Sequence, residues 1–163
     1  MSFPLHHERS AVLDATAEQA FVYLDDFRAL SAHMEKRSPM MAGLRMRVSM
    51  DPLGGRAVGS RVTMEGRLLG MDLRLEEVVT ERKPPLRKAW QTVEARLVVI
   101  GSYRLGFELS PKARGSMLRV FIDYDLPPRG LARWPGRFLA RSYAHWCVHR
   151  MVGDAVGRFG QHA

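Results

Sequence analysis

Apolar and polar residues alternate along most of the chain between Leu44 and Leu126. A period of two is typical of a β-strand that buries one face and exposes the other. Five runs show this period, and a sixth at residues 88–94 leaves the facing open. Turn-forming residues such as Gly54-Gly55 and Pro84-Pro85 separate the runs without an intervening helical pattern, so we expect consecutive antiparallel strands. The positions assigned to the buried face are Met46, Val48, Met50, Val58, Ser60, Val62, Met64, Leu68, Met71, Leu73, Leu75, Tyr103, Leu105, Phe107, Leu109, Leu118, Val120, Ile122, Tyr124 and Leu126.

A strand and two short helices are predicted before this sheet, and a long helix after it. Residues 7–14 are predicted to form the first strand, and residues 16–19 have the S/T-x-x-E/Q form of a capping box that begins a helix. A second short helix is expected at residues 27–34. The closing helix is expected at residues 135–158, with Pro135 in its first turn. Its predicted stripe toward the sheet comprises Phe138, Ser142, His145, His149, Val152 and Val156.

These elements predict an α+β protein in which a curved antiparallel sheet of about seven strands wraps around one long C-terminal helix. We treat residues 1–163 as a single domain, because no linker, repeat or low-complexity tract divides them. A sheet that covers only one helix leaves a gap between the two layers. We expect a ligand in that gap.

Composition and charge indicate the cellular compartment and the kind of partner to expect. Cys147 is the only cysteine, so an internal disulfide is excluded and a reducing compartment is expected. With no secretion signal or membrane-spanning apolar stretch in the sequence, we expect a cytoplasmic protein. The net charge is +8, and only 4 of the 25 basic residues are lysines.

The arginines are mostly placed singly between apolar residues, which predicts the solvated outer face of the sheet. A basic surface for an anionic partner is the alternative. Arginines recur every fourth residue from Arg129 to Arg141, and these are the candidates for peripheral contact with an anionic membrane. No nucleic-acid-binding motif accompanies the charge, so no nucleic-acid partner is predicted.

Three short motifs and the order of the elements resemble a known superfamily. The motifs are Ala15-Thr16-Ala17-Glu18-Gln19-Ala20-Phe21, Gly59-Ser60-Arg61-Val62 and Tyr103-Arg104-Leu105-Gly106-Phe107-Glu108-Leu109. Together they resemble the START-like (SRPBCC) helix-grip proteins, and most of all the bacterial polyketide cyclase and lipid-transport branch. The resemblance covers nearly the whole chain and implies a helix-grip fold with a hydrophobic cavity between sheet and helix. It implies no particular reaction, because the superfamily includes carriers, cyclases, hormone receptors and chaperone activators.

Methionines are frequent among the residues predicted to face the gap. Their flexible, polarizable side chains adapt to irregular apolar guests, although ordinary core packing explains the same pattern. Aromatic residues of the later strands and residues of the closing helix complete the set. The predicted ligand-binding residues are Met46, Met64, Met71, Leu73, Leu75, Trp90, Tyr103, Phe107, Tyr124, Phe138, His145 and His149.

His145 and His149 are the most distinctive polar pair in the sequence. Their spacing of four places both imidazoles on one side of a helix, one turn apart. Three interpretations stay open: hydrogen-bonded interior histidines, ligand-binding or acid–base groups, and metal ligands. A metal ion requires a third ligand, which His6 or His7 would have to supply. We predict no metal site and no cofactor.

The sequence therefore predicts a protein that binds or carries a small hydrophobic molecule, lipid-like or aromatic and polyketide-like, in a cavity between the sheet and the closing helix. The alternative is an enzyme of the polyketide cyclase or dehydratase type that uses the cavity histidines as acid and base. A third interpretation is an adaptor that works through its basic helix. The catalytic residues and the oligomeric state stay open.

Overall fold

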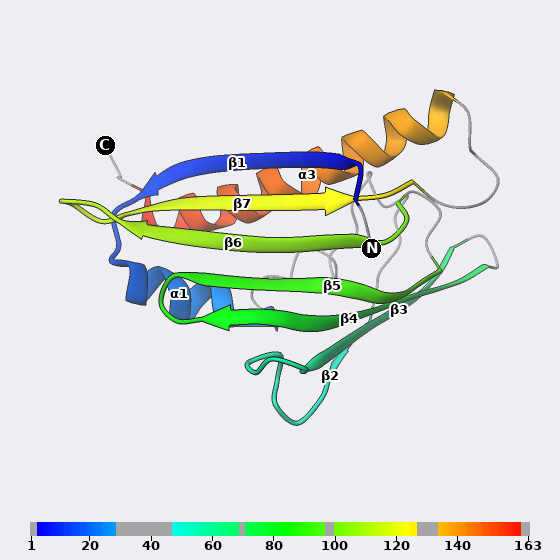
Figure 1. The fold of residues 1–163 in the computed structure, drawn as a ribbon, viewed down its shortest axis with the longest axis horizontal. Coiled ribbons are helices and arrows are strands. Elements are labelled where there is room, and N and C mark those ends of the chain that lie inside the picture. The colour runs from blue at the N-terminus through cyan, green and yellow to red at the C-terminus, as the bar shows by residue number, and fades with distance from the viewer. Residues whose placement is uncertain (1–2, 29–46, 69–70, 97–99, 127–133, 161–163) are drawn as a thin grey trace.

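The computed structural model describes residues 3–28, 47–68, 71–96, 100–126 and 134–160 (Figure 1). The strands are β1 (Leu5–Leu13), β2 (Arg47–Met50), β3 (Arg61–Leu68), β4 (Met71–Lys83), β5 (Arg87–Arg96), β6 (Tyr103–Pro111) and β7 (Ser116–Tyr124). The helices are α1 (Ala17–Asp25) and α3 (Trp134–Phe159). Most of the second short helix predicted at residues 27–34 lies outside the described residues.

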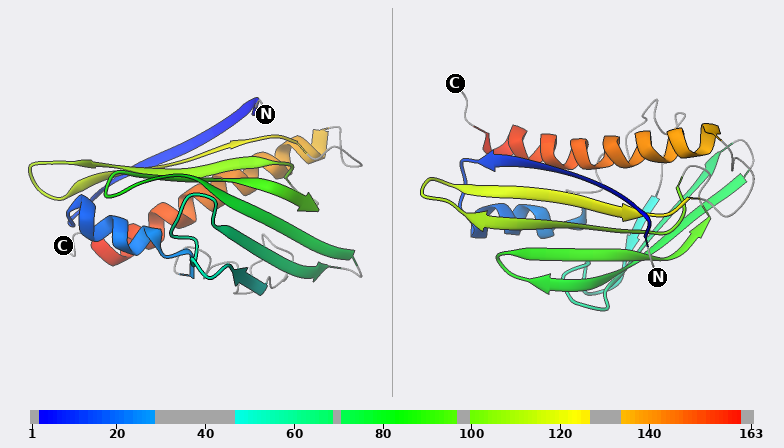
Figure 2. Two further views of the ribbon diagram at one scale, coloured as in Figure 1. Left: turned by 60° about the horizontal axis from the view of Figure 1, so that its bottom comes forward. Right: turned by 45° about the horizontal axis from the view of Figure 1, so that its top comes forward.

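All seven strands form one antiparallel sheet in the order β1-β7-β6-β5-β4-β3-β2. From β2 to β7 each strand pairs with its neighbour in sequence, and β1 joins the far edge beside β7. Both helices lie on the same side of the sheet (Figure 2). The predicted α+β helix-grip architecture is confirmed.

The capping box predicted at residues 16–19 begins α1. The Thr16 hydroxyl accepts a hydrogen bond from the Gln19 amide at 3.3 Å, and the Thr16 amide donates to the Gln19 side chain at 3.0 Å. These two bonds satisfy backbone donors that a helix start leaves unpaired. The helix then buries Phe21 and Leu24 against the sheet, where the Phe21 ring lies 5.6 Å from that of Phe107.

The buried side of α3 differs from the predicted stripe. Phe138 is 72% exposed, Val156 is 37% exposed, and His145 is also exposed, so the prediction for these three residues was wrong. The residues that α3 buries are Ala140, Tyr143, Ala144, Cys147, Val148, Met151, Val152 and Ala155. Many of them are small, and small side chains allow the helix backbone to lie close to the sheet. The predicted stripe favoured larger residues and missed this.

Among the described residues, the sheet follows the predicted alternation in most places, and Val58 is an exception. Val58 lies in the turn before β3 and is 62% exposed. Phe121 lies on the outer face with Arg104 and Arg119, as the alternation predicts, and is only 3% exposed because guanidinium groups cover its ring. It also packs against Gly106, where a Cβ atom would lie 2.7 Å from the Phe121 ring. Three guanidinium groups lie 5.4 to 5.6 Å from the centroid of that ring: Arg87, Arg104 and Arg119.

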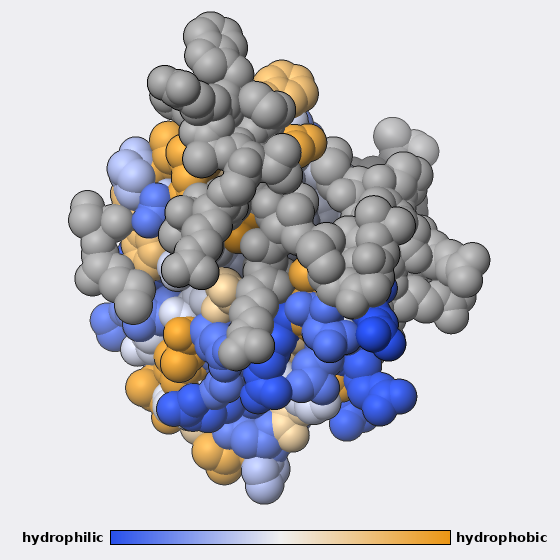
Figure 3. All heavy atoms as spheres, turned by 90° about the vertical axis from the view of Figure 1, so that its right-hand side faces the viewer, coloured by the Kyte–Doolittle hydropathy of each residue, from blue (hydrophilic) through white to orange (hydrophobic). Residues whose placement is uncertain are grey.

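Arginines of the outer face also form ion pairs with acidic residues of neighbouring strands. Arg119 contacts Glu108 at 2.7 Å and also contacts Glu8, and Arg74 contacts Glu65 at 2.9 Å. Hydrophilic side chains also gather in the lower part of the end viewed in Figure 3. These contacts support the solvated-face interpretation of the arginines. Among the described residues, no helix is long and apolar enough to cross a membrane.

Candidate functional site

The structure brings most of the predicted ligand-binding residues together in one buried hydrophobic cluster, to which the sheet, α1 and α3 contribute. Those buried in this cluster are Met64, Leu73, Leu75, Trp90, Tyr103, Phe107 and Tyr124. Met46 and the side chain of Met71 lie outside the described part of the chain. Phe138 and His145 are exposed and His149 is half-buried, so these three residues do not join the interior group.

A carboxyl group lies inside this apolar cluster. Glu77 of β4 is 1% exposed, and its Oε1 accepts a hydrogen bond of 2.5 Å from the Tyr103 hydroxyl. Its other oxygen, Oε2, is buried and has no hydrogen-bond partner among the described residues. Burial raises the pKa of Glu77 to about 7, although the hydrogen bond from Tyr103 and the nearby Trp90 side chain act in the opposite direction. Near neutral pH the group therefore populates both protonation states.

Two side chains of α3 lie close enough to Glu77 to sense its charge. Burial raises the pKa of Cys147 to about 12 and that of Tyr143 well above its usual range, and the charge of Glu77 adds to both shifts. Cys147 is therefore a neutral thiol, not a thiolate nucleophile. Tyr103, from the sheet, has a raised pKa for the same reasons, burial first and Glu77 second. The carboxyl group thus lies between β4, β6 and α3.

A row of cross-strand neighbours leads from Glu77 to the β2 edge of the sheet. Glu77 is paired with Val62 of β3, and Val62 is paired with Met50 of β2. Adjacent strands lie about 4.8 Å apart, so Met50 and Glu77 are separated by roughly 10 Å across the inner face. Val62 is 1% exposed, whereas Met50 is half-buried. The row therefore runs from the interior toward an accessible edge.

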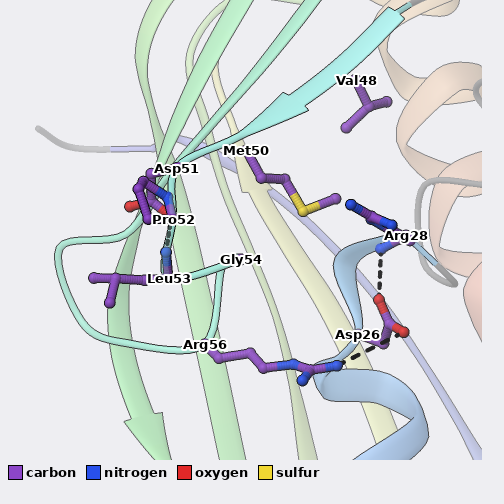
Figure 4. A pocket seen from close by; sticks show the side chains of 9 residues that line it. All are labelled: Asp26, Arg28, Val48, Met50, Asp51, Pro52, Leu53, Gly54 and Arg56. Carbon is purple, nitrogen blue, oxygen red and sulfur yellow. Dashed lines mark hydrogen bonds and ion pairs between the residues drawn. The ribbon is translucent and has the colours of Figure 1, made fainter.

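Met50 borders a pocket of about 780 Å³ at that edge. The pocket lies between the end of α1 and the loop that joins β2 to β3, and the Met50 side chain points across it toward Arg28 (Figure 4). Arg56 forms an ion pair with Asp26 at 3.8 Å on the same side. The residues that line the pocket are Asp26, Arg28, Val48, Met50, Asp51, Pro52, Leu53, Gly54 and Arg56.

A second buried charge cluster joins α1 to the sheet. Lys88 of β5 is fully buried, and its ammonium donates to the Asp25 carboxylate at 2.8 Å and to the Asp25 carbonyl at 2.9 Å. Arg82 donates to the same carboxylate at 2.8 Å. Burial raises the pKa of Asp25, but the bonds from Arg82 and Lys88 outweigh it and the pKa is lowered. With both cations held by one carboxylate, the arrangement is typical of a structural anchor.

The histidine pair of α3 faces β1 instead of the interior. The rings of His145 and His149 stack with their centroids 3.8 Å apart, and the His7 ring lies 4.9 Å from that of His145. Arg9 donates a hydrogen bond to Nδ1 of His149. Burial and the neighbouring histidines lower the pKa of His7, and burial, His145 and Arg9 lower that of His149. The neutral forms of His7 and His149 are therefore favoured at neutral pH.

Sequence reasoning missed Glu77 but contained the signal for it. The alternation through Leu73 and Leu75 continues to residue 77, which places this acid on the buried face of its strand. His7 was considered only as a third metal ligand. Its place beside His145 depends on the pairing of β1 with β7 and on the packing of α3 along β1, neither of which is local in sequence.

Known proteins that resemble this chain have the same architecture, an open antiparallel sheet packed around one long helix. The chain belongs to the family described as polyketide cyclase / dehydrase and lipid transport, which matches residues 4–158. The curated proteins gave no significant match.

Solved structures of low sequence identity share the fold. The Zhui aromatase/cyclase from Streptomyces sp. R1128 is 13% identical, with a TM-score of 0.71 over 94% of this chain and 92% of that one. Protein CV1439 from Chromobacterium violaceum is 17% identical, with a TM-score of 0.63 over 97% and 99% of the two chains. Major latex-like protein 151 from Panax ginseng is 11% identical, with a TM-score of 0.57 over 91% and 94%.

Proposed function

We propose that the protein binds a small, mostly apolar molecule with a carbonyl or phenol oxygen between the sheet and α3, and that Glu77 is its polar contact. The observation that carries this proposal is the Glu77 carboxyl group, 1% exposed and with Oε2 unpartnered among the described residues. A buried polar atom without a partner costs about 1–3 kcal/mol. A ligand oxygen that pairs with Oε2 removes that cost.

The surroundings of Glu77 favour an apolar guest. Trp90, Tyr103 and Phe107 are buried in the same hydrophobic cluster, and apolar burial contributes about 25 cal/mol per Å² before the costs of binding. Protonated Glu77 donates a hydrogen bond to a carbonyl, and ionised Glu77 accepts one from a phenol. The family description, which names polyketide cyclases and lipid transport, fits such molecules.

The pocket beside Met50 is the proposed entrance. Its apolar wall, Val48 and Met50, continues through Val62 to Glu77 by cross-strand pairing. Arg28 and Arg56 flank the opening and suit an oxygen-rich or acidic end of the guest. The guest therefore enters through this pocket, places its carbonyl or phenol oxygen at Glu77 and leaves a second, oxygen-rich or acidic end near the two arginines.

The test compares two probes of similar shape, a hydroxylated anthraquinone and anthracene, by fluorescence titration of the purified protein. We expect both to bind and Glu77→Gln to weaken the anthraquinone about tenfold, or 1.4 kcal/mol, while sparing anthracene. Gln keeps an oxygen for Tyr103 but cannot ionise. Glu76→Gln, on the outer side of the same strand, should change neither affinity. The proposal is overturned if the wild-type protein binds neither probe. It is also overturned if the Glu77→Gln variant binds the anthraquinone as tightly as wild type does.

The pKa of Glu77, about 7, favours acid–base catalysis as a second candidate function. The Glu77 carboxylate takes a proton from a carbon that lies between two carbonyl groups. That carbon then forms a bond to the carbon of a third carbonyl group in the same substrate. Protonated Glu77 then returns the proton to the new alkoxide, giving a hydroxyl that can leave as water with a neighbouring proton. His145 and His149 do not reach this interior, so the acid–base role passes from them to Glu77. Turnover of a synthetic tetraketide, the shortest chain in which such a carbon closes a six-membered ring, by wild type but not by Glu77→Gln supports it, and equal turnover excludes Glu77 as the base.

A further inference from the structure

Three histidines from two elements gather beside the edge strand β1. His7 lies on β1, and His145 and His149 lie one turn apart on α3. One ring nitrogen of each histidine lies within 4.8 Å of those of the other two. Nε2 of His7 is buried and has no hydrogen-bond partner among the described residues. The cluster therefore offers one nitrogen donor from each ring, and His7 carries a buried nitrogen without a partner among the described residues.

We propose that His7, His145 and His149 bind one divalent transition-metal ion of the zinc class, with water in the fourth position. Imidazole nitrogen is a preferred ligand of zinc, nickel and copper ions, and three histidines with one open position form a recognised coordination set. This site is independent of the proposed binding function, because His145 projects from the exposed side of α3 and Cys147 from its buried side.

The geometry requires only small side-chain movements. Zn–N bonds of about 2.0–2.1 Å at a tetrahedral ion place the donor nitrogens about 3.4 Å apart. The donors already lie within 4.8 Å of one another, and His145 is exposed, so rotation of its side chain closes the difference without backbone movement. His7 and His149 come from β1 and α3, which pack against each other and so position the two residues.

Two cations oppose metal binding and give the proposal a sharp test. Arg9 donates a hydrogen bond to Nδ1 of His149, and the charge of Arg141 reaches His7. If Nδ1 of His149 binds the ion, Arg9 must release it. If Nε2 binds, Nδ1 carries the proton and again cannot accept from Arg9. Replacing Arg9 with Gln should therefore strengthen metal binding about threefold or more.

The experiment titrates untagged, chelator-treated protein with Zn²⁺ in competition with a chromophoric chelator. We expect one ion per chain with a Kd in the micromolar range or below. His7→Gln, His145→Gln and His149→Gln should each raise that Kd about tenfold or more. His6→Gln is the matched control, because His6 is adjacent on β1 but bonds to Asp123 at 2.6 Å and Glu8 at 2.9 Å. Its Kd should stay within about twofold of wild type.

Cobalt provides a readout that a merely structural cluster does not give. Co²⁺ bound by three histidines and water absorbs strongly in the visible region when four-coordinate, and this absorption should disappear in each of the three His→Gln variants. A Zn²⁺ Kd above about 100 μM overturns the proposal. So does a metal stoichiometry or affinity that the three substitutions leave unchanged, since the ion would then bind elsewhere on the chain.

Discussion

At the level of single residues, Glu77 couples the stability of the protein to pH. Its ordinary pKa is 4.5 and burial raises it to about 7, so between these pH values the folded protein binds a proton that the unfolded chain has released. The free energy of unfolding therefore falls as pH rises from about 4.5 to 7 and loses no more above that range. The difference corresponds to about 3 kcal/mol.

Glu77→Gln should remove this part of the pH dependence, because Gln has no proton to lose. Urea unfolding at several pH values between about 5 and 8 gives the free energy of unfolding of wild type and variant. The difference between the two at each pH measures the contribution of Glu77. Glu76→Gln serves as the control and should keep the wild-type slope. Parallel profiles for wild type and Glu77→Gln would contradict the assignment of the slope to this carboxyl group.

The local sequence pattern predicts which residues are buried. It is less informative about the function of those residues. Leu75 and Phe107 follow from a period of two, since the backbone alone sends alternate side chains to opposite faces. Glu77 obeys the same period, but an acid at a core position conflicts with its own hydration, and such conflicts often mark functional sites. His7 could not be assigned in this way, because its partners on α3 lie some 140 residues away.

At the level of elements, the anchor between α1 and the sheet rests on Asp25. Asp25→Asn should lower the free energy of unfolding by about 3 kcal/mol or more, because Lys88 remains buried without a counter-charge. Lys88→Met should cost less, since Arg82 still pairs with Asp25 and the Met side chain fills the space. Urea unfolding of each variant measures both losses.

An exposed ion pair provides the control for this anchor. Asp72 and Arg67 approach to 3.4 Å but are largely solvated, so Asp72→Asn should change stability by less than about 0.5 kcal/mol. Equal losses for Lys88→Met and Asp25→Asn would contradict the argument, because they would show that Arg82 does not balance the carboxylate.

The elements also show where sequence patterns mislead. Alternation predicted the strands because neighbouring strands reinforce the same two faces. For the closing helix, the predicted stripe included the large side chain of Phe138, which is exposed. The sheet instead receives Ala140, Ala144 and Ala155, all fully buried, because close approach of a helix to a sheet favours small residues.

At the level of the whole molecule, α3 connects two sites that face in different directions. Its buried side carries Tyr143 and Cys147, which sense the charge of Glu77, and its side next to β1 carries His145 and His149. The first and last described elements also meet, since the Asp14 amide donates to the Phe159 carbonyl at 2.7 Å. A metal ion between β1 and α3 would therefore clamp elements from opposite ends of the chain without touching the interior.

Such an arrangement predicts additive stabilisation by the two ligands. Zn²⁺ at about 100 times its Kd should raise the free energy of unfolding by about 2.7 kcal/mol, and the anthraquinone probe should add its own increment. At independent sites, the two increases in the free energy of unfolding add to within about 0.5 kcal/mol. Urea unfolding with neither ligand, each ligand alone and both together therefore tests whether the sites are independent. His145→Gln, which weakens zinc about tenfold, should lower the zinc increment by about 1.4 kcal/mol and keep the other, and Glu77→Gln should lower only the anthraquinone increment by about as much. A joint effect that differs from the sum by 1 kcal/mol or more would instead show that α3 transmits metal binding to the interior.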